Sequence, residues 1–183
     1  MFHPDTQFLI DRWVELARGA SVRGGIPART GFAPEVLGAR LARTFLVRGS
    51  GSGSTLRLAG SWIESLHHRK LAGAPFLDLW CEASPPLVLP ALTHAIREAR
   101  PVVIISHLGP DAIQTEVTVA PLRSGDGRPD LFLGLASPAT NPSLAQGEPR
   151  RLTARVTTGA GQQGRPDLRL VEPHAQPKAA SAR

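Results

Sequence analysis

The sequence has no tyrosine and only one methionine and one cysteine in 183 residues, and aromatic side chains make up 5% of it. The single cysteine, Cys81, cannot form an internal disulfide, which fits a reducing compartment. The longest apolar run, residues 101–105, is far shorter than the roughly 20 residues that span a bilayer. The amino terminus has no cationic stretch followed by an apolar one, so we expect no secretory signal. We therefore expect a cytoplasmic protein without a membrane partner.

Acidic side chains are fewer than basic ones, and the excess of basic side chains is unevenly distributed along the chain. The chain carries a formal net charge of +6, and +4 of this falls in residues 141–183, which leaves the body near neutral. The pair Arg150–Arg151 is too short for a nucleic-acid groove, which would need clustered contacts on a folded face. We expect a solvated basic tail, and a nucleic-acid partner is unlikely on this pattern.

An amphipathic helix is predicted at the amino terminus, over residues 4–18. Its apolar side chains recur at helical spacing and are Phe8, Leu9, Trp13, Leu16 and Ala17. Pro4 suits the first turn of this helix and Gly19 suits its end. Residues 19–31 lack periodicity and are expected to form a loop.

Helices and strands are predicted in turn over the next hundred residues. The predicted strands are 44–48, 56–58, 102–108, 113–122 and 130–136, and the predicted helical segments are 32–41, 62–66, 75–81 and 86–99. The third and fifth strands are apolar on both faces, as in strands that are covered on both sides. The amphipathic amino-terminal helix is a natural candidate to cover one of these faces.

Residues 138–183 differ in composition from the rest of the chain. Six prolines stand there among Gly, Gln, Ala and Arg. Leu152, Ala154 and Val156 alternate only weakly, so short extended segments are allowed but an independent core is not. We expect a flexible Pro/Gly-rich basic tail that is dispensable for folding.

One stretch, residues 56–63, joins a strand-like alternation to a helical pattern through Gly60. Arg29 and Phe32-Ala33-Pro34 precede it, and residues 73–80 follow it. This order of elements resembles the PAS sensor domain, in particular the small stand-alone PAS proteins of bacteria, over residues 8–137. The resemblance implies an α+β fold with a five-stranded antiparallel sheet in the order 2-1-5-4-3. It divides the chain into residues 1–31 (helix and loop), 32–137 (PAS-like domain) and 138–183 (tail).

Two sets of residues are candidates for function. The first could line a ligand cavity between sheet and helices, and consists of Trp62, Phe76, Leu79, Trp80 and Leu92. The alternative for this set is that the side chains only fill the core. The second set could contact a partner and consists of Phe8, Trp13, Leu16 and Arg29. For Arg29 the alternative is a guanidinium that bonds loop carbonyls or a carboxylate. Arg57 points away from Leu56 and Leu58 and either lines a polar pocket or faces solvent.

No catalytic or metal-binding pattern stands out. The six histidines do not form a ligand set, Cys81 lacks the polar motif that flavin-adduct PAS domains require, and residues 49–54 lack the ending of a phosphate loop. No metal site is predicted, and any cofactor is unknown. The function expected from the resemblance is non-enzymatic: a PAS protein that senses a small molecule or relays a signal by protein contact. Its expected partners are signalling proteins such as histidine kinases, and it is expected to form a homodimer. The rival is a ligand-free adaptor, and an enzyme ranks last.

Overall fold

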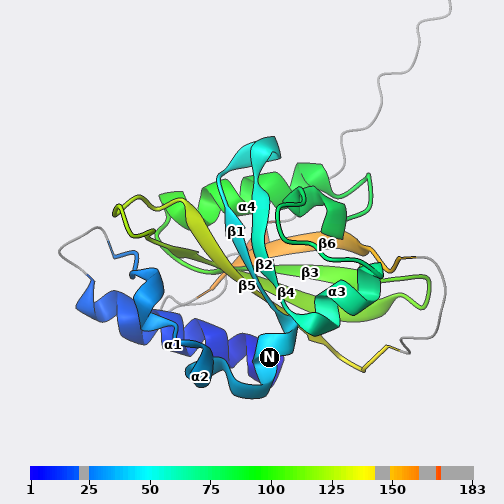
Figure 1. Ribbon diagram of the computed structural model, residues 1–183, viewed down its shortest axis with the longest axis horizontal. Helices are drawn as coiled ribbons and strands as arrows, with labels where there is room; N and C mark the ends of the chain where they lie inside the picture. Colours follow the sequence, from blue (N-terminus) through cyan, green and yellow to red (C-terminus); the bar gives the residue numbers. More distant parts are fainter. Residues whose placement is uncertain (21–24, 143–148, 161–167, 170–183) are drawn as a thin grey trace, which may run out of the picture.

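The fold is built on one antiparallel sheet with helices on both faces. The computed structural model describes residues 1–20, 25–142, 149–160 and 168–169. The strands are β1 (Thr44–Arg48), β2 (Thr55–Ala59), β3 (Val102–Leu108), β4 (Ile113–Leu122), β5 (Leu131–Pro138), β6 (Leu152–Gly159) and β7 (Leu168–Arg169). Their order in the sheet is β2-β1-β5-β4-β3-β6-β7 (Figure 1). The α+β class and the predicted order of the first five strands are confirmed.

Short and long helical segments connect these strands. They are α1 (Pro4–Gly19), η2 (Arg29–Gly31), α2 (Pro34–Leu37), η3 (Gly38–Arg43), η4 (Gly51–Gly53), α3 (Ser61–His67), η5 (Phe76–Leu79) and α4 (Pro85–Arg97). The sequence predicts one helix over residues 32–41, whereas α2 ends at Leu37. The next residue, Gly38, has a positive φ of 51° and begins the 3-10 helix η3.

The inner face of the sheet carries the main core. Apolar side chains of β1, β3, β4 and β5 pack there against α3, η5 and α4, with Phe45, Ile104, Val117 and Phe132 at most 1% exposed. Gly60, between β2 and α3, has no room for a side chain. A Cβ at this position would lie 2.3 Å from the carbonyl oxygens of both Leu41 and Ala42.

Helix α1 covers the outer face, as the apolar strands predicted. Leu9 and Trp13 pack on β4 and β5 against Ala120, Leu122 and Leu133, in a second apolar cluster. Figure 1 shows the resulting layers, with α1 below the sheet and α4 above it. The arrangement lies within one chain, so α1 completes its own subunit.

Two further strands, β6 and β7, correct the predicted count of five. Strand β6 comes from the segment that we expected to be a tail, and it pairs along the whole length of β3, from Leu152 opposite Leu108 to Gly159 opposite Val102. Leu152 and Ala154 join the main core. The prediction of a tail without core contacts is therefore wrong for residues 152–159. The alternation was weak because its inward residues include a small alanine. Residues 143–148, 161–167 and 170–183 of the predicted tail lie outside the described part of the chain.

Strand β2 also departs from the expected alternation. Leu46 pairs with Leu58 and Val47 pairs with Leu56, so Arg57 is an extra residue in a β-bulge. The bulge shifts the side chains that follow it. Leu56 is fully buried, but Leu58, which we expected on the same face, is 44% exposed. Arg57 and Leu58 thus both lie outside the inner core.

Candidate functional site

The predicted ligand site is a packed part of the core. Phe76, Leu79, Trp80 and Leu92 are each at most 2% exposed. Trp62, on α3, is half-buried and packs against the edge of this group. The ring centroids of Phe45 and Phe76 lie 5.7 Å apart, and those of Phe76 and Trp80 lie 6.0 Å apart with an edge-on geometry. These are the distances of ordinary aromatic packing.

The space left inside this core is very small. A void of about 10 Å³ remains beside Trp62 and Leu79, also lined by His67 and Leu108. Phe76, Trp80 and Leu92 do not line it. A volume of roughly 10–15 Å³ holds a single water molecule, whereas ligand sites span about 300–1,000 Å³. The structure therefore does not bring the five predicted residues around a cavity of ligand size.

Some polar atoms in the interior have no partner. The indole nitrogen of Trp80 and the hydroxyl oxygens of Thr118 and Ser137 are buried without a hydrogen bond within the described residues. Leaving such a group unpaired costs about 1–3 kcal/mol. Among the described residues, the void beside Trp62 and Leu79 is lined by none of these three groups.

A buried histidine lies at the wall of the small void. His67 ends α3 and is 5% exposed. Burial lowers the pKa of His67 from 6.5 to about 4, and the positive charges of Arg69 and Arg151 act in the same direction. His67 is therefore neutral at pH 7, and its protonation favours the unfolded state.

Within the part of the chain that the structure describes, no three side chains of His, Cys, Asp or Glu gather into a group that could hold a metal ion. Among the helices of the described ranges, none combines the length and apolar character needed to cross a membrane.

Cys81 lies beside β6, where its sulfur accepts a hydrogen bond of 3.3 Å from the hydroxyl of Thr153.

The apolar residues that we expected to contact a partner are used within the chain. Trp13 is 3% exposed and donates a hydrogen bond to the carbonyl oxygen of Pro121. The guanidinium carbon of Arg40 lies 4.1 Å from the centroid of the Phe8 ring. Leu16 packs so closely on Gly31 that a Cβ there would lie 2.9 Å from its methyl carbons. The role of these residues in partner binding stays a prediction.

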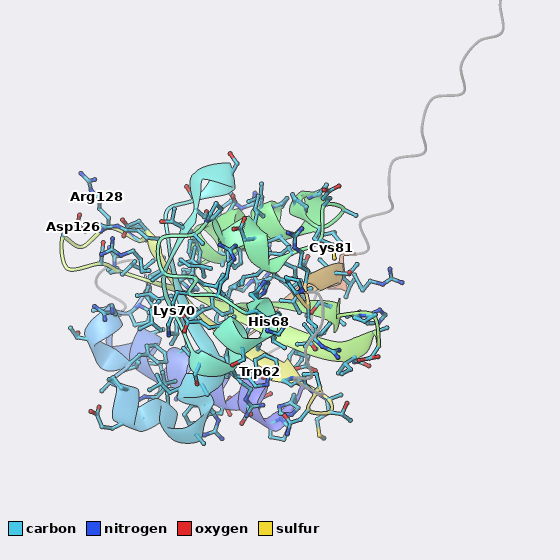
Figure 2. The ribbon with its side chains drawn as sticks, turned by 45° about the vertical axis from the view of Figure 1, so that its right-hand side comes forward. Trp62, His68, Lys70, Cys81, Asp126 and Arg128 are labelled. Carbon is cyan, nitrogen blue, oxygen red and sulfur yellow. The ribbon has the colours of Figure 1, made fainter. Side chains whose placement is uncertain are left out.

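Arg29, the fourth of these residues, lies in a different environment. It lines a shallow outer-face depression of about 290 Å³ together with Arg48 and Arg57. The remaining lining residues are Leu46, Ser124, Gly125, Asp126 and Leu131. Figure 2 shows Asp126 and Arg128 at the tip of the hairpin that joins β4 and β5. We call this depression the arginine pocket.

Each arginine reaches the pocket from a separate segment. The backbone N–H of Arg29 donates to the carbonyl oxygen of Arg123 at 3.1 Å, and the N–H of Arg123 donates to that of Pro27 at 2.9 Å, so the loop before η2 is tied to the end of β4. Arg48 ends β1 and forms an ion pair of 3.2 Å with Asp130. Arg57 is the extra residue of the β2 bulge.

The sequence identified two of the three arginines as candidates, but it did not predict that all three line one pocket. Arg29 and Arg57 were singled out, each with a solvent-facing or structural alternative, whereas Arg48 was not. The signal for Arg48 is its place on β1: alternation from the inward Phe45 and Val47 puts Leu46 and Arg48 on the outer face. The link to Arg29 depends on the loop contact with Arg123, which no sequence period reveals.

The sheet order and the helices packed on its inner face define the class of α+β domain to which the chain belongs. A PAS domain model matches residues 1–137, and the chain belongs to the PAS domain family. PAS domains are sensory and signalling modules. No curated protein matches the sequence.

Several solved structures are similar in fold. One is a light-oxygen-voltage domain studied with a flavin analogue, which is 14% identical to this chain. The match covers 58% of this chain and 84% of that chain, with a TM-score of 0.45. The blue-light photoreceptor Aureochrome1 LOV in its light state has 17% identity, coverages of 60% and 91%, and a TM-score of 0.42. An RNA-binding light-oxygen-voltage receptor has 22% identity, coverages of 62% and 36%, and a TM-score of 0.43. These likenesses say nothing about what this chain binds.

Proposed function

We propose that this PAS protein regulates signalling by contact with other proteins, through its surface and without a metabolite in its interior. The observation that carries the proposal is the size of the internal void, about 10 Å³. A ligand among Trp62, Phe76 and Trp80 would have to displace side chains that are already packed. That ligand site stays a prediction, and the ligand-free adaptor is the function we favour.

The outer face supports a role in protein contact. Helix α1 packs on β4 and β5, while at the β1–β2 end of the sheet Leu58 is 44% exposed beside its cross-strand partner Leu46. Exposed leucines next to arginines are common in protein interfaces, where Arg is enriched and apolar groups form the centre. A non-enzymatic mode of action, a cytoplasmic location, a homodimer and histidine kinases as partners stay predictions.

Photo-crosslinking in the host cell tests the proposal. A photoreactive residue in place of Leu58 should give a discrete crosslinked protein adduct, because this side chain is exposed on the proposed contact face. A photoreactive residue in place of Arg155, which is exposed on β6, serves as the control. Adducts that are equal at the two positions would contradict a contact at the β1–β2 end.

A thermal-shift screen with metabolites tests the second half of the proposal. A ligand at a hundredfold excess over its Kd stabilises the folded state by about 2.7 kcal/mol, which raises Tm by several degrees for a domain of this size. We expect no metabolite to do so. A metabolite that raises Tm, and loses this effect when Leu92 is replaced by Phe, would restore the internal ligand site.

A further inference from the structure

The arginine pocket has charges that the chain itself does not neutralise. Arg48 is paired with Asp130, but the described residues offer no hydrogen bond or ion pair to the guanidinium groups of Arg29 and Arg57. Both side chains are exposed. The one acidic residue in the lining is Asp126, and Arg48 is paired with Asp130, so Arg29 and Arg57, which have no partner among the described residues, share the pocket with one carboxylate.

Asp126 is itself occupied by local hydrogen bonds. Its carboxylate accepts from the hydroxyl of Ser124 and, at 3.2 Å, from the backbone N–H of Arg128. The hydrogen bond from Ser124 is the main reason that the pKa of Asp126 lies below its ordinary value. Asp126 therefore fixes the hairpin turn, and the pocket keeps a net positive charge.

Two leucines form the apolar part of the pocket wall. Leu46 and Leu131 line it, and Leu58 stands opposite Leu46 across the β1–β2 pair. Leu131 is 6% exposed and Leu58 is 44% exposed. An apolar side chain that enters between the arginines would find leucines beneath it. The combination suits a segment that carries carboxylates on both sides of an apolar residue.

We infer that the arginine pocket is the docking site for an acidic segment of a partner protein, whose carboxylates bind Arg29 and Arg57 while an apolar side chain between them packs on Leu46 and Leu58. This inference rests on the proposed function and specifies its partner. A guanidinium binds a carboxylate through two parallel N–H···O bonds, which makes arginine the suitable residue here. The guanidinium groups of Arg29 and Arg57 are exposed, so a side chain that protrudes from a partner surface can reach them.

The position of Arg57 strengthens the inference. It is the extra residue of a bulge in β2, the edge strand of the sheet, and bulges at sheet edges re-aim a side chain and end further pairing. The bulge brings Arg57 to the same side as Leu58. Without it, regular alternation would put Arg57 and Leu58 on opposite faces.

The chain supplies a matched control for Arg57. Arg155 is the extra residue of a second bulge, in β6, since Ile105 pairs with Val156 and Ser106 pairs with Ala154. It is also exposed and lies towards the other end of the sheet. Arg155→Gln removes the same charge from the same kind of backbone position without touching the pocket.

Nuclear magnetic resonance of the arginine Nε–H groups in the full chain tests the inference. The probe is a short capped peptide in which glutamates flank a central leucine. We expect it to shift the Nε–H signals of Arg29 and Arg57, and to bind about tenfold more weakly to Arg29→Gln/Arg57→Gln. Arg155→Gln should bind within about twofold of the parent, and added salt should weaken binding. A Tm equal to that of the parent checks that the variants are folded, and Arg57→Gln alone serves if the double variant is not.

Four outcomes would overturn the inference, and the last of them leaves the proposed function intact. The first is binding of the corresponding glutamine peptide as tight as that of the glutamate peptide. The second is an equal loss of affinity in Arg155→Gln, which would indicate a general charge effect. The third is a stronger shift of the same signals by inorganic phosphate at equal concentration, which would assign the pocket to a free small anion. If the peptide fails while crosslinking from Leu58 still captures a protein, the pocket is excluded and the proposed function stands.

Discussion

The indole N–H of Trp13 donates a hydrogen bond of 2.7 Å to the carbonyl oxygen of Pro121, and this bond joins α1 to the end of β4. It is a contact between residues 108 positions apart. The same end of β4 leads to Arg123, which holds the loop that carries Arg29. The helix that covers the outer face and the arginine pocket are therefore fixed to one strand end.

Substitutions of Trp13 should destabilise the fold, and the larger truncation should cost more. Trp13→Phe keeps most of the ring but leaves the Pro121 carbonyl without its donor, at a cost of about 1–3 kcal/mol in the free energy of unfolding. Trp13→Ala also opens a cavity and should cost about 3–5 kcal/mol. Phe8→Ala, on the half-buried side of the same helix, should cost less than about 1.5 kcal/mol. Denaturant melts measure all three, and equal costs for Phe8→Ala and Trp13→Ala would show that α1 is not anchored through Trp13.

Strand β6 should be required for folding. A chain that ends at Thr140 loses Leu152 and Ala154 from the core, and exposes the edge of β3. It also loses the 2.8 Å bond from the Cys81 N–H to the Leu152 carbonyl. We expect a loss of at least about 3 kcal/mol, or insolubility.

The control for this experiment is a chain that ends at Arg169 and so keeps both β6 and β7. It should melt like the full chain when both are followed by circular dichroism. If the chain that ends at Thr140 melts at the same temperature as this control, β6 contributes nothing to the core.

Stability should fall as the pH drops from about 6.5 towards 4. The pKa of His67 is about 4 in the folded chain against 6.5 when unfolded, so the unfolded state takes up the proton first. The contribution of His67 to the free energy of unfolding is complete above pH 6.5. It is lost as the pH falls towards 4, by roughly 3 kcal/mol in total.

The comparison that isolates this effect is His67→Gln, which cannot titrate. Its stability should vary less between pH 6.5 and 4 than that of the parent, measured by urea unfolding at each pH. His68→Gln keeps His67 in place and removes only the smallest of the charges that lower its pKa, so it should retain most of the decrease. Parallel pH profiles for the parent and His67→Gln would contradict the buried neutral histidine.

Replacement of Ala99 by glycine should stabilise the fold. It follows the end of α4 with a positive φ of 46°, a region that costs a side chain roughly 1 kcal/mol and that glycine adopts freely. Ala99→Gly should therefore raise the free energy of unfolding by about 0.5–1 kcal/mol. Ala95→Gly, inside the same helix, should lower it by at least about 1 kcal/mol. A decrease for both variants would show that Ala99 does not hold the left-handed conformation in solution.

Most of the fold follows from periodicity in the sequence, and its departures have local causes. Strands β1, β3 and β4 are predicted with their observed bounds because each alternates or is uniformly apolar between clear turn residues. Strand β6 is missed because Ala154 and Thr158 give little contrast with the prolines and glycines around them. The bulge at Arg57 is missed because pairing with β1, and not local sequence, determines it.

The candidate sites were harder to predict than the fold. Trp62, Phe76 and Trp80 are placed together as expected, but whether a group of large side chains leaves a cavity depends on how their volumes fit. The arginine pocket draws on η2, β1 and β2, which meet only through the sheet order and the tie at Arg123. Sequence patterns identify the residues, and tertiary contacts decide which of them meet.

Native mass spectrometry of the full chain, purified freshly from its host, tests the central claim most directly, because it reports bound mass and stoichiometry together. An interior with a void of about 10 Å³ predicts protein species whose masses equal the polypeptide or its complexes with other proteins, without an added small molecule. A constant added mass on each copy of the chain, lost on denaturation, would show that the core opens for a ligand and would contradict the account.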